Sequence, residues 1–171
     1  MSRAFVKEPD GEAAEGDEPL PPDSPHPLYV TPDGLAALQD SLRILQRQSG
    51  GPLPAEPAER QRLQRLRREA RIVERKLGRA ILVDPHGQPS DKVAFGQWVT
   101  VEDDDGKESV YRIVGEDQSD PARGWISWLS PLAQALRGAE IGDRVSWRRP
   151  AGTVNLTLLT IDADAPRGHA E

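Results

Sequence analysis

Residues 63 to 77, LQRLRREARIVERKL, repeat their apolar side chains at the spacing of a coiled coil. Successive apolar positions are three, four, three and four residues apart, so one side of a helix carries all of them. They are Leu63, Leu66, Ala70, Val73 and Leu77. A similar stripe precedes them at Leu35, Leu38, Leu42 and Leu45. Two such stripes joined by a loop predict an antiparallel two-helix coiled-coil hairpin over residues 31–80.

The first helix of this hairpin has a start signal in TPDGL. Thr31 can cap the helix, Pro32 suits the first helical position because it lacks an N–H, and Asp33 favours the positive end of the helix dipole. Gly34 stands where a capping box would place Glu or Gln. We expect the helix to run to about Gln48, a length of about 24 Å.

The loop between the stripes, RQSGGPLPAEPAE at residues 47–59, is rich in glycine and proline. These residue types suit a turn that reverses the chain. We expect residues 49–58 to form the tip, where Glu56 is the one acid, and Glu59 follows in the next helix. The loop is either the working tip of the hairpin or a plain turn.

The outer face of the second predicted helix is basic. Residues 31–80 carry eleven Lys and Arg against six Asp and Glu, a balance of +5, although the whole chain has a formal net charge of -6. Such a face is either solvated or contacts phosphate groups or an acidic partner. Its members are Arg60, Arg62, Arg65, Arg67, Arg68, Arg71, Arg75, Lys76 and Arg79.

Residues 1–30 are acidic and proline-rich, with seven acids against two bases. They contain few large apolar side chains, which predicts a disordered tail. This tail could fold back over the arginines of the hairpin and screen them. Phe5 and Val6, flanked by charges, are either a short docking peptide or part of a frayed terminus.

The second half of the chain changes to a period of two. WVTVEDDDGKESVYRIV, residues 98–114, alternates on both sides of Asp105 and Gly106, which predicts a β-hairpin. A strand up to Leu129 should be followed by a short helix capped by Ser130 and closed by Gly138. Two more strands are predicted in IGDRVSW and TVNLTLLTI. Together they predict an α+β fold, with an antiparallel sheet and one helix over residues 93–162, a linker at 81–92 and a frayed end at 163–171.

Several classes of function lack their sequence signals. The chain has no cysteine and no run of about 20 apolar residues, so we expect a cytoplasmic protein that neither crosses nor binds a membrane. We expect no cofactor, no small-molecule substrate and no metal site. His26, His86 and His169 lack metal-ligand spacing, and the acids at 102–105 fit a solvated turn. The four tryptophans are expected to pack in or beside the core rather than stack on bases.

Five segments of the C-terminal half carry a family resemblance. They are FG at 95–96, RIVGEDQSD at 112–120, ISWLSPLAQALRG at 126–138, GD at 142–143 and PAG at 150–152. With these, residues 93–161 resemble the C-terminal domain of the bacterial GreA/GreB transcription elongation factors, and a preceding helical hairpin is also the arrangement of that family.

The resemblance implies an FKBP-like (FK506-binding-protein-like) domain that docks at the rim of the RNA polymerase secondary channel, with the hairpin pointing into the channel. It also implies polymerase contacts at Ser130 and Pro131, together with Leu129, where many members have Asp or Asn. Classical factors carry acids in a D-x-x-E-N pattern at the tip, and these help to hold a catalytic magnesium ion in the polymerase. The tip here has no such pattern, so no catalytic residue is carried over, and the short hairpin resembles that of the regulator of nucleoside diphosphate kinase.

The leading interpretation is therefore a non-enzymatic regulator that binds RNA polymerase, with at most weak or indirect nucleic-acid contact through the hairpin. Three alternatives stay open. The protein could stimulate transcript cleavage through Glu56 or Glu59, or act as an FKBP-like peptide-binding module, or bind nucleic acid directly through the basic face.

Overall fold

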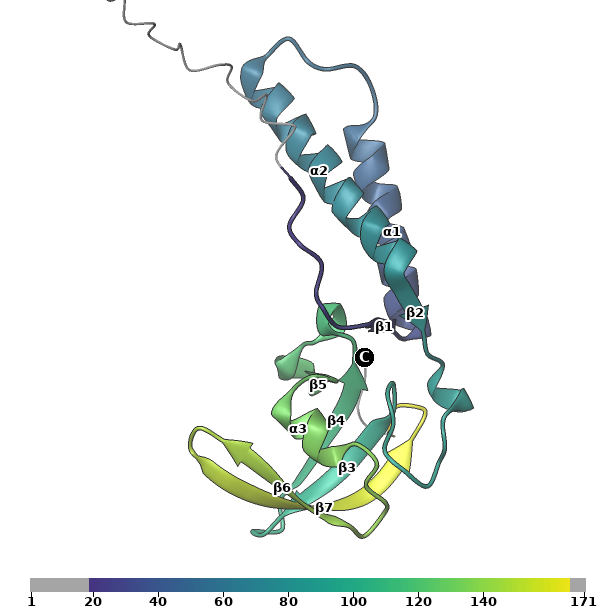
Figure 1. Cartoon of the computed structure of the whole chain (residues 1–171), viewed down its shortest axis with the longest axis vertical. Coiled ribbons are helices and arrows are strands. Elements are labelled where there is room, and N and C mark those ends of the chain that lie inside the picture. Colours follow the sequence, from purple (N-terminus) through teal and green to yellow (C-terminus); the bar gives the residue numbers. More distant parts are fainter. Residues whose placement is uncertain (1–18, 167–171) are drawn as a thin grey trace, which may run out of the picture.

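The computed structural model describes residues 19–166 as a helical hairpin standing on a curled sheet domain (Figure 1). The suggested docking peptide around Phe5 and Val6 lies outside the described residues, as does His169. The hairpin and the sheet domain follow one another in the chain in the predicted order, so the α+β class is confirmed.

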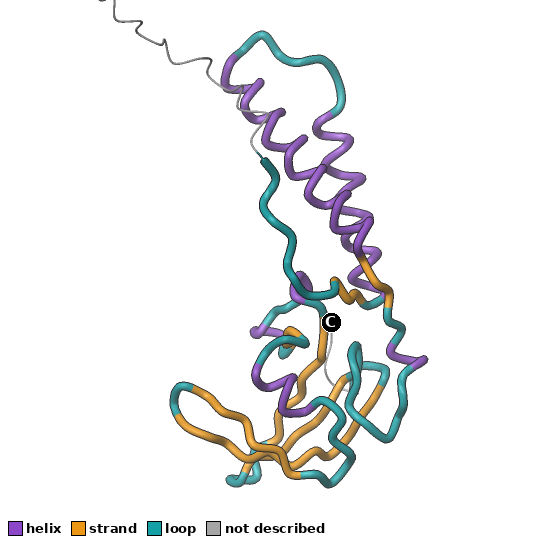
Figure 2. Tube along the Cα trace, viewed as in Figure 1, coloured by secondary structure: helices purple, strands orange, loops and turns teal. Residues whose placement is uncertain are grey.

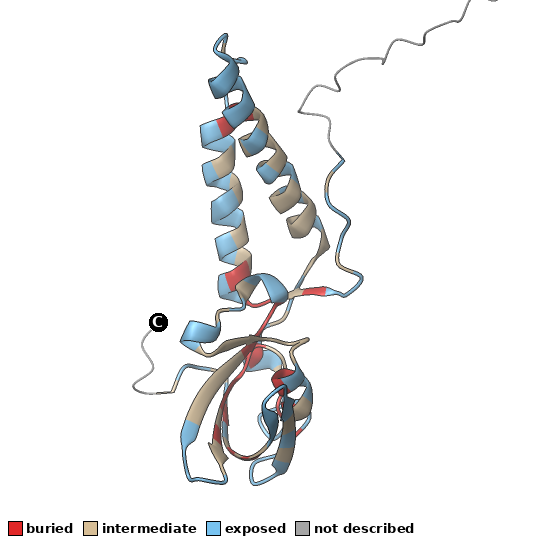
Figure 3. Cartoon of the chain, turned by 90° about the vertical axis from the view of Figure 1, so that its left-hand side faces the viewer, coloured by how far each residue is buried: buried red, intermediate tan, exposed pale blue. Residues whose placement is uncertain are grey.

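The hairpin consists of α1 (Pro32–Ser49) and α2 (Pro57–Arg79), which pack along their predicted stripes. At 1.5 Å per residue the two helices are about 27 and 34 Å long. Most of the stripe is half-buried, and Leu63 is buried with 7% of its surface exposed. A pair of helices has no third element to close its seam, which explains why the hairpin is less buried than the sheet domain when the chain is coloured by burial (Figure 3).

The base of the hairpin contains a short parallel pair of strands, β1 (Leu28–Val30) and β2 (Ala80–Leu82). The sequence places residues 28–30 in the predicted disordered tail, and that boundary is wrong. Val30 is 1% exposed, and the Tyr29 ring packs on Phe95 and Trp128 at centroid distances of 5.7 and 5.1 Å. Apolar burial and pairing with β2 therefore order the end of the tail.

The sheet domain has five strands in the order β5-β4-β3-β7-β6 (Figure 2). The strands are β3 (Trp98–Asp103), β4 (Glu108–Val114), β5 (Trp125–Ser127), β6 (Arg144–Arg149) and β7 (Gly152–Asp162). Three pairings are antiparallel as predicted, but β4 and β5 are parallel, and β5 ends before Leu129. The connection at residues 115–124 contains the 3-10 turns η2 (Glu116–Gln118) and η3 (Pro121–Arg123). This connection returns the chain toward the starting end of β4, so β5 runs in the same direction as β4. A tight turn would have reversed the direction and made the pair antiparallel.

The core of the molecule lies between this sheet and α3 (Pro131–Leu136). Val99, Val101, Leu136 and Leu158 are fully buried there. Trp98 is 7% exposed, and the rings of the other tryptophans are partly buried beside the sheet, as expected for packing residues. No helix within residues 19–166 is both long and apolar enough to span a membrane.

Candidate functional site

The loop at the hairpin tip is held by two arginines of α2. Arg67 donates hydrogen bonds to the carbonyl oxygens of Ser49 and Gly51, at 3.3 and 2.8 Å. Arg60 donates to the carbonyl oxygens of Pro54 and Ala55, at 3.2 and 3.1 Å. These contacts satisfy carbonyls at the end of α1 and in the loop that have no partner within a helix. Part of the predicted basic face therefore stabilises the tip itself.

The two acids near the tip are exposed. Glu56 is the N-cap residue of α2, but its side chain accepts no capping hydrogen bond, and Glu59 lies in the first turn. Within the described part of the chain, no group of three or more His, Asp or Glu side chains is arranged to hold a metal ion. The tip thus presents isolated carboxylates at the positive end of a helix.

The C-terminal half of the basic face is covered by residues 19–24, which we call the strap. Arg68 donates to the Pro19 carbonyl at 3.1 Å, and Arg75 to the Pro21 carbonyl at 2.5 Å. Asp23 pairs with Arg75 and Arg79 at 3.1 and 2.9 Å. The tail does fold back over the hairpin in this segment, which agrees with one of the interpretations of the sequence.

A clamp at residues 115–118 joins the sheet domain to the base of the hairpin. Gln118 donates to the Thr31 hydroxyl at 2.7 Å, and its amide oxygen accepts from the Thr31 N–H at 3.2 Å. Thr31 is fully buried and also caps α1 by accepting from the Gly34 N–H at 3.2 Å. A β-carbon at Gly34 would lie 2.2 Å from Gln118 Cδ, so this glycine makes room for the clamp.

Two ion pairs fix the same junction. The Arg112 guanidinium binds both carboxylate oxygens of Asp33, at 2.7 and 2.9 Å, and lies over the rings of Trp98 and Trp125. Partial burial raises the pKa of Asp33, but hydrogen bonds from Arg112 and Thr31 and the charge of Arg112 outweigh it and bring the pKa below 3.8. Lys76 of α2 pairs with Asp117 of the clamp at 2.7 Å.

The segment expected to face the polymerase lies between β5 and α3. Ser130 caps α3 by accepting from the Ala133 N–H at 3.2 Å, and Pro131 is the first helical residue, as predicted. Pro131 is exposed, whereas Leu129 and Ser130 are half-buried. The three residues are consecutive in the chain, but they lie on the sheet domain and not on the hairpin tip, so the two candidate regions are separate.

The acids at residues 102–105 are used within the fold. Asp103 accepts hydrogen bonds from the Asp105 and Lys107 N–H groups, both at 3.0 Å, which closes the predicted β-turn. Asp104 pairs with Arg144 at 2.6 Å and accepts from Asn155 at 3.2 Å. The turn is thus accounted for by structural contacts.

The histidines are also placed by local contacts. The His26 ring lies edge-on to Trp128 at a centroid distance of 6.3 Å. His86 lies between Asp84 and Asp164, at 3.1 and 3.2 Å. The hydrogen bond to Asp84 and the charge of Asp164 raise the pKa of His86 above its ordinary value.

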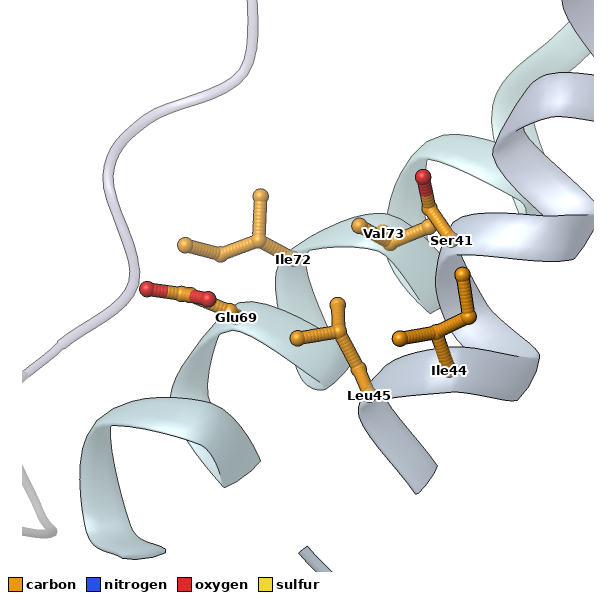
Figure 4. A pocket seen from close by; sticks show the side chains of 6 residues that line it. All are labelled: Ser41, Ile44, Leu45, Glu69, Ile72 and Val73. Carbon is orange, nitrogen blue, oxygen red and sulfur yellow. The ribbon is translucent and has the colours of Figure 1, made fainter. Parts of the chain in front are cut away.

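An apolar groove of about 410 Å³ runs between the two helices (Figure 4). Ile44 and Leu45 of α1 lie across from Ile72 and Val73 of α2, and Glu69 stands at its edge. Ile44 is 53% exposed, so the outward part of the groove is open to solvent.

The clamp is the part of this arrangement that sequence reasoning missed. From the sequence alone, the segment RIVGEDQSD is interpreted as a strand that ends in a turn. Its partners Thr31 and Asp33 lie about 80 residues earlier, with separations of 87 and 79 residues, so no local pattern could pair them. The one local signal was Gly34, which is a poor helix residue unless a close contact requires it.

Comparison with known proteins identifies the family. Residues 88–163 match the family model for the C-terminal domain of transcription elongation factor GreA/GreB. Transcription elongation factor GreB of Pasteurella multocida is 35% identical over 149 residues, which covers 78% of this chain and 94% of the relative. Transcription elongation factor GreA of Desulfovibrio desulfuricans is 42% identical over 96 residues, or 54% of this chain and 59% of the relative.

Among solved structures, GreA factor homolog 1 of Thermus thermophilus aligns with a TM-score of 0.39 and 23% identity, covering 80% of this chain and 99% of that chain. Family membership rests on the sequence matches, of which the GreB relative spans most of both chains. The chain belongs to the GreA/GreB family of transcription elongation factors.

Proposed function

We propose that this protein binds RNA polymerase at the rim of the secondary channel and regulates elongation without stimulating transcript cleavage. GreA/GreB factors are elongation factors that act on RNA polymerase and are not enzymes in their own right. In this proposal the sheet domain docks on the polymerase in the bacterial cytoplasm, and the hairpin enters the channel.

The tip of the hairpin is the observation that carries the non-cleaving part of the proposal. Metal-assisted chemistry needs ligands that are held in place before the reaction. Here Glu56 is exposed and makes no capping contact, while Arg60 and Arg67 are committed to backbone carbonyls of the loop. The loop is therefore built as a fixed turn with a single unsupported acid.

The length of the hairpin supports the same conclusion. Its first helix is about 27 Å long, and the loop adds seven residues before Pro57. The resemblance to the classical factors implies a longer hairpin in those proteins than the one in this chain. A shorter hairpin would leave the tip farther from the active site of the polymerase.

The docking surface in this proposal includes Pro131 and the neighbouring Leu129 and Ser130. Pro131 is exposed at the first turn of α3, where it is free to contact a partner without breaking the cap. The clamp then matters because it sets the direction in which the hairpin leaves the docked domain. Hydrogen bonds and ion pairs at Thr31, Asp33 and Lys76 fix that direction.

Cleavage stimulation through Glu56 or Glu59 is the second candidate, and it is favoured by the exposure of both carboxylates. The docking step, on which both candidates depend, is tested first. Purified core polymerase is incubated with the tagged protein, and bound protein is then competed with a classical GreB factor. We expect retention on the polymerase and mutual displacement; no retention at micromolar concentrations would refute the docking proposal.

A further inference from the structure

The strap places a row of oxygen atoms against the arginines of α2. Three of its contacts are made by backbone carbonyls, those of Pro19, Pro21 and Ser24, which accept from Arg68, Arg75 and Arg79. The carboxylate of Asp23 bridges the last two of these arginines. In Figures 1 and 2 the strap runs as an extended segment beside α2, with no helix or strand of its own.

The composition of the strap explains why it can lie this way. Residues 19–24 are PLPPDS, and each proline removes an N–H and holds φ near −65°, which favours an extended backbone whose carbonyls have no internal partners. Such a segment is already stiff before it binds, so little conformational entropy is lost when it lies on the helix. Its carbonyls are therefore well suited to accept hydrogen bonds from guanidinium groups.

The surface underneath has the properties of an anion-binding face. Arg68, Arg75 and Arg79 are seven and four residues apart, which places them on one side of α2 over about 16 Å of helix. Arginine donates several N–H groups in a planar fork and is the usual residue for phosphate recognition. Residues 31–80 carry a balance of +5 as eleven bases against six acids, so the face is attractive to an extended polyanion once it is uncovered.

We propose that the strap is an internal competitor that covers a binding face for single-stranded nucleic acid on α2. The strap imitates such a strand, because it is extended and presents oxygen acceptors along its backbone to one arginine after another. An acidic protein partner would instead present carboxylates, and Asp23 is the only carboxylate within the strap's six residues. A nucleic acid is the ligand that this pattern of acceptors fits best.

Release of the strap does not require unfolding of the domain. Its contacts with α2 are half-exposed, with Arg75, Arg79 and Asp23 between 32% and 39% exposed, so each contact is weak. The lower end of the strap is anchored to the sheet domain, since the Ser24 hydroxyl donates to Glu116 at 3.2 Å, and the chain that follows is held where β1 pairs with β2. Residues 19–23 can therefore leave α2 while the base of the hairpin stays intact.

The test needs no polymerase, and so it is independent of the proposed docking. The full chain is titrated into a fluorescent single-stranded RNA oligonucleotide at low salt, and affinity is measured by anisotropy. Asp23→Asn removes the bridging carboxylate, and Asp91→Asn is the matched control because it removes the same charge from an exposed loop of the sheet domain. Pro21→Gly loosens the strap without changing the charge.

We expect Asp23→Asn to bind the oligonucleotide about threefold more tightly than the unchanged chain or Asp91→Asn. A factor of this size corresponds to the free energy of the partly exposed ion pairs that Asp23 makes with Arg75 and Arg79. Pro21→Gly should act in the same direction, and the salt dependence of Asp23→Asn should be steeper by about one unit in log–log slope. The gain should disappear when Arg75→Gln and Arg79→Gln are added to Asp23→Asn.

The proposal is overturned if Asp23→Asn binds no more tightly than Asp91→Asn, or if the gain survives loss of the two arginines. A parallel titration with poly-glutamate tests the class of partner. If the variants gain affinity for poly-glutamate and none for RNA, the covered face is a site for acidic protein and the assignment to nucleic acid is wrong. Thermal melting of each variant confirms that all of them are folded.

Discussion

Asp33 at the start of α1 and Arg112 in β4 form a bidentate ion pair between the hairpin and the sheet domain, with N–O distances of 2.7 and 2.9 Å. The Arg112 side chain is 11% exposed and lies over two tryptophan rings. This pair and the Gln118 contact with Thr31 make the junction a rigid one, although the helices themselves are only half-buried.

Replacement of Arg112 with lysine should weaken the junction even though the charge is kept. Lysine cannot make the paired hydrogen bonds to a carboxylate and stacks less well on aromatic rings. We expect a loss of about 1 kcal/mol in the free energy of unfolding, measured by urea denaturation. Arg148→Lys, on the exposed edge strand β6, is the control and should change stability little; equal losses in both variants would show that the ion pair contributes nothing specific.

The Asp33 contribution should depend on pH in a defined direction. Because the pKa of Asp33 in the folded protein lies below 3.8, the carboxylate stabilises the fold fully above that pH. The stabilisation is lost as the pH falls through the lowered pKa. We therefore expect the difference in unfolding free energy between the wild type and Asp33→Asn to be constant near pH 7 and to shrink below pH 3.8; a difference that grows on acidification would contradict this assignment.

Two helical glycines should respond oppositely to alanine. At Gly34 a β-carbon would meet the Gln118 amide and break its hydrogen bonds to buried Thr31, so Gly34→Ala should cost about 1 to 2 kcal/mol. At Gly78, near the end of α2, an added β-carbon would have no atom within 4 Å, so Gly78→Ala should stabilise by about 0.5 to 1 kcal/mol through helix propensity. Chemical denaturation of both variants measures this contrast, and the same sign in both would refute the clamp.

Ser130 should show separable effects on stability and on polymerase binding. Ser130→Ala removes the cap of α3 and should cost about 1 kcal/mol, whereas Ser130→Asp keeps a capping oxygen and should retain most of the stability. If Ser130 also contacts the polymerase, both variants should bind the enzyme more weakly. Pro131→Ala should lower affinity with little change in stability, and polymerase binding equal to wild type in all three would remove this segment from the docking surface.

Local chemistry explains why much of this architecture could be predicted from sequence. Thr31 and Ser130 cap their helices as expected, and the turn at Asp105 and Gly106 forms because Gly106 adopts a left-handed backbone with φ of 76°. The apolar stripes predicted the helix pair because their period is repeated over many residues. Each of these features depends on residues that are close together in the chain.

The features that could not be predicted depend on residues far apart. The strand at Leu28–Val30 is too short to show an alternating pattern, and it is ordered by β2, about 50 residues later. The direction of β5 follows from its connection and not from its own residues. Gly34 appeared to weaken the helix start, and only the position of Gln118 shows why a side chain has no room there.

In the proposed function, the protein occupies the polymerase channel without supplying cleavage chemistry. A backtracked elongation complex with labelled RNA is incubated with this protein alone, and then with a classical GreB factor in the presence of increasing amounts of this protein. We expect the RNA to stay at full length in the first case and cleavage by the GreB factor to slow in the second. Shortened RNA with this protein alone, or GreB cleavage that is unchanged at saturating protein, would contradict it.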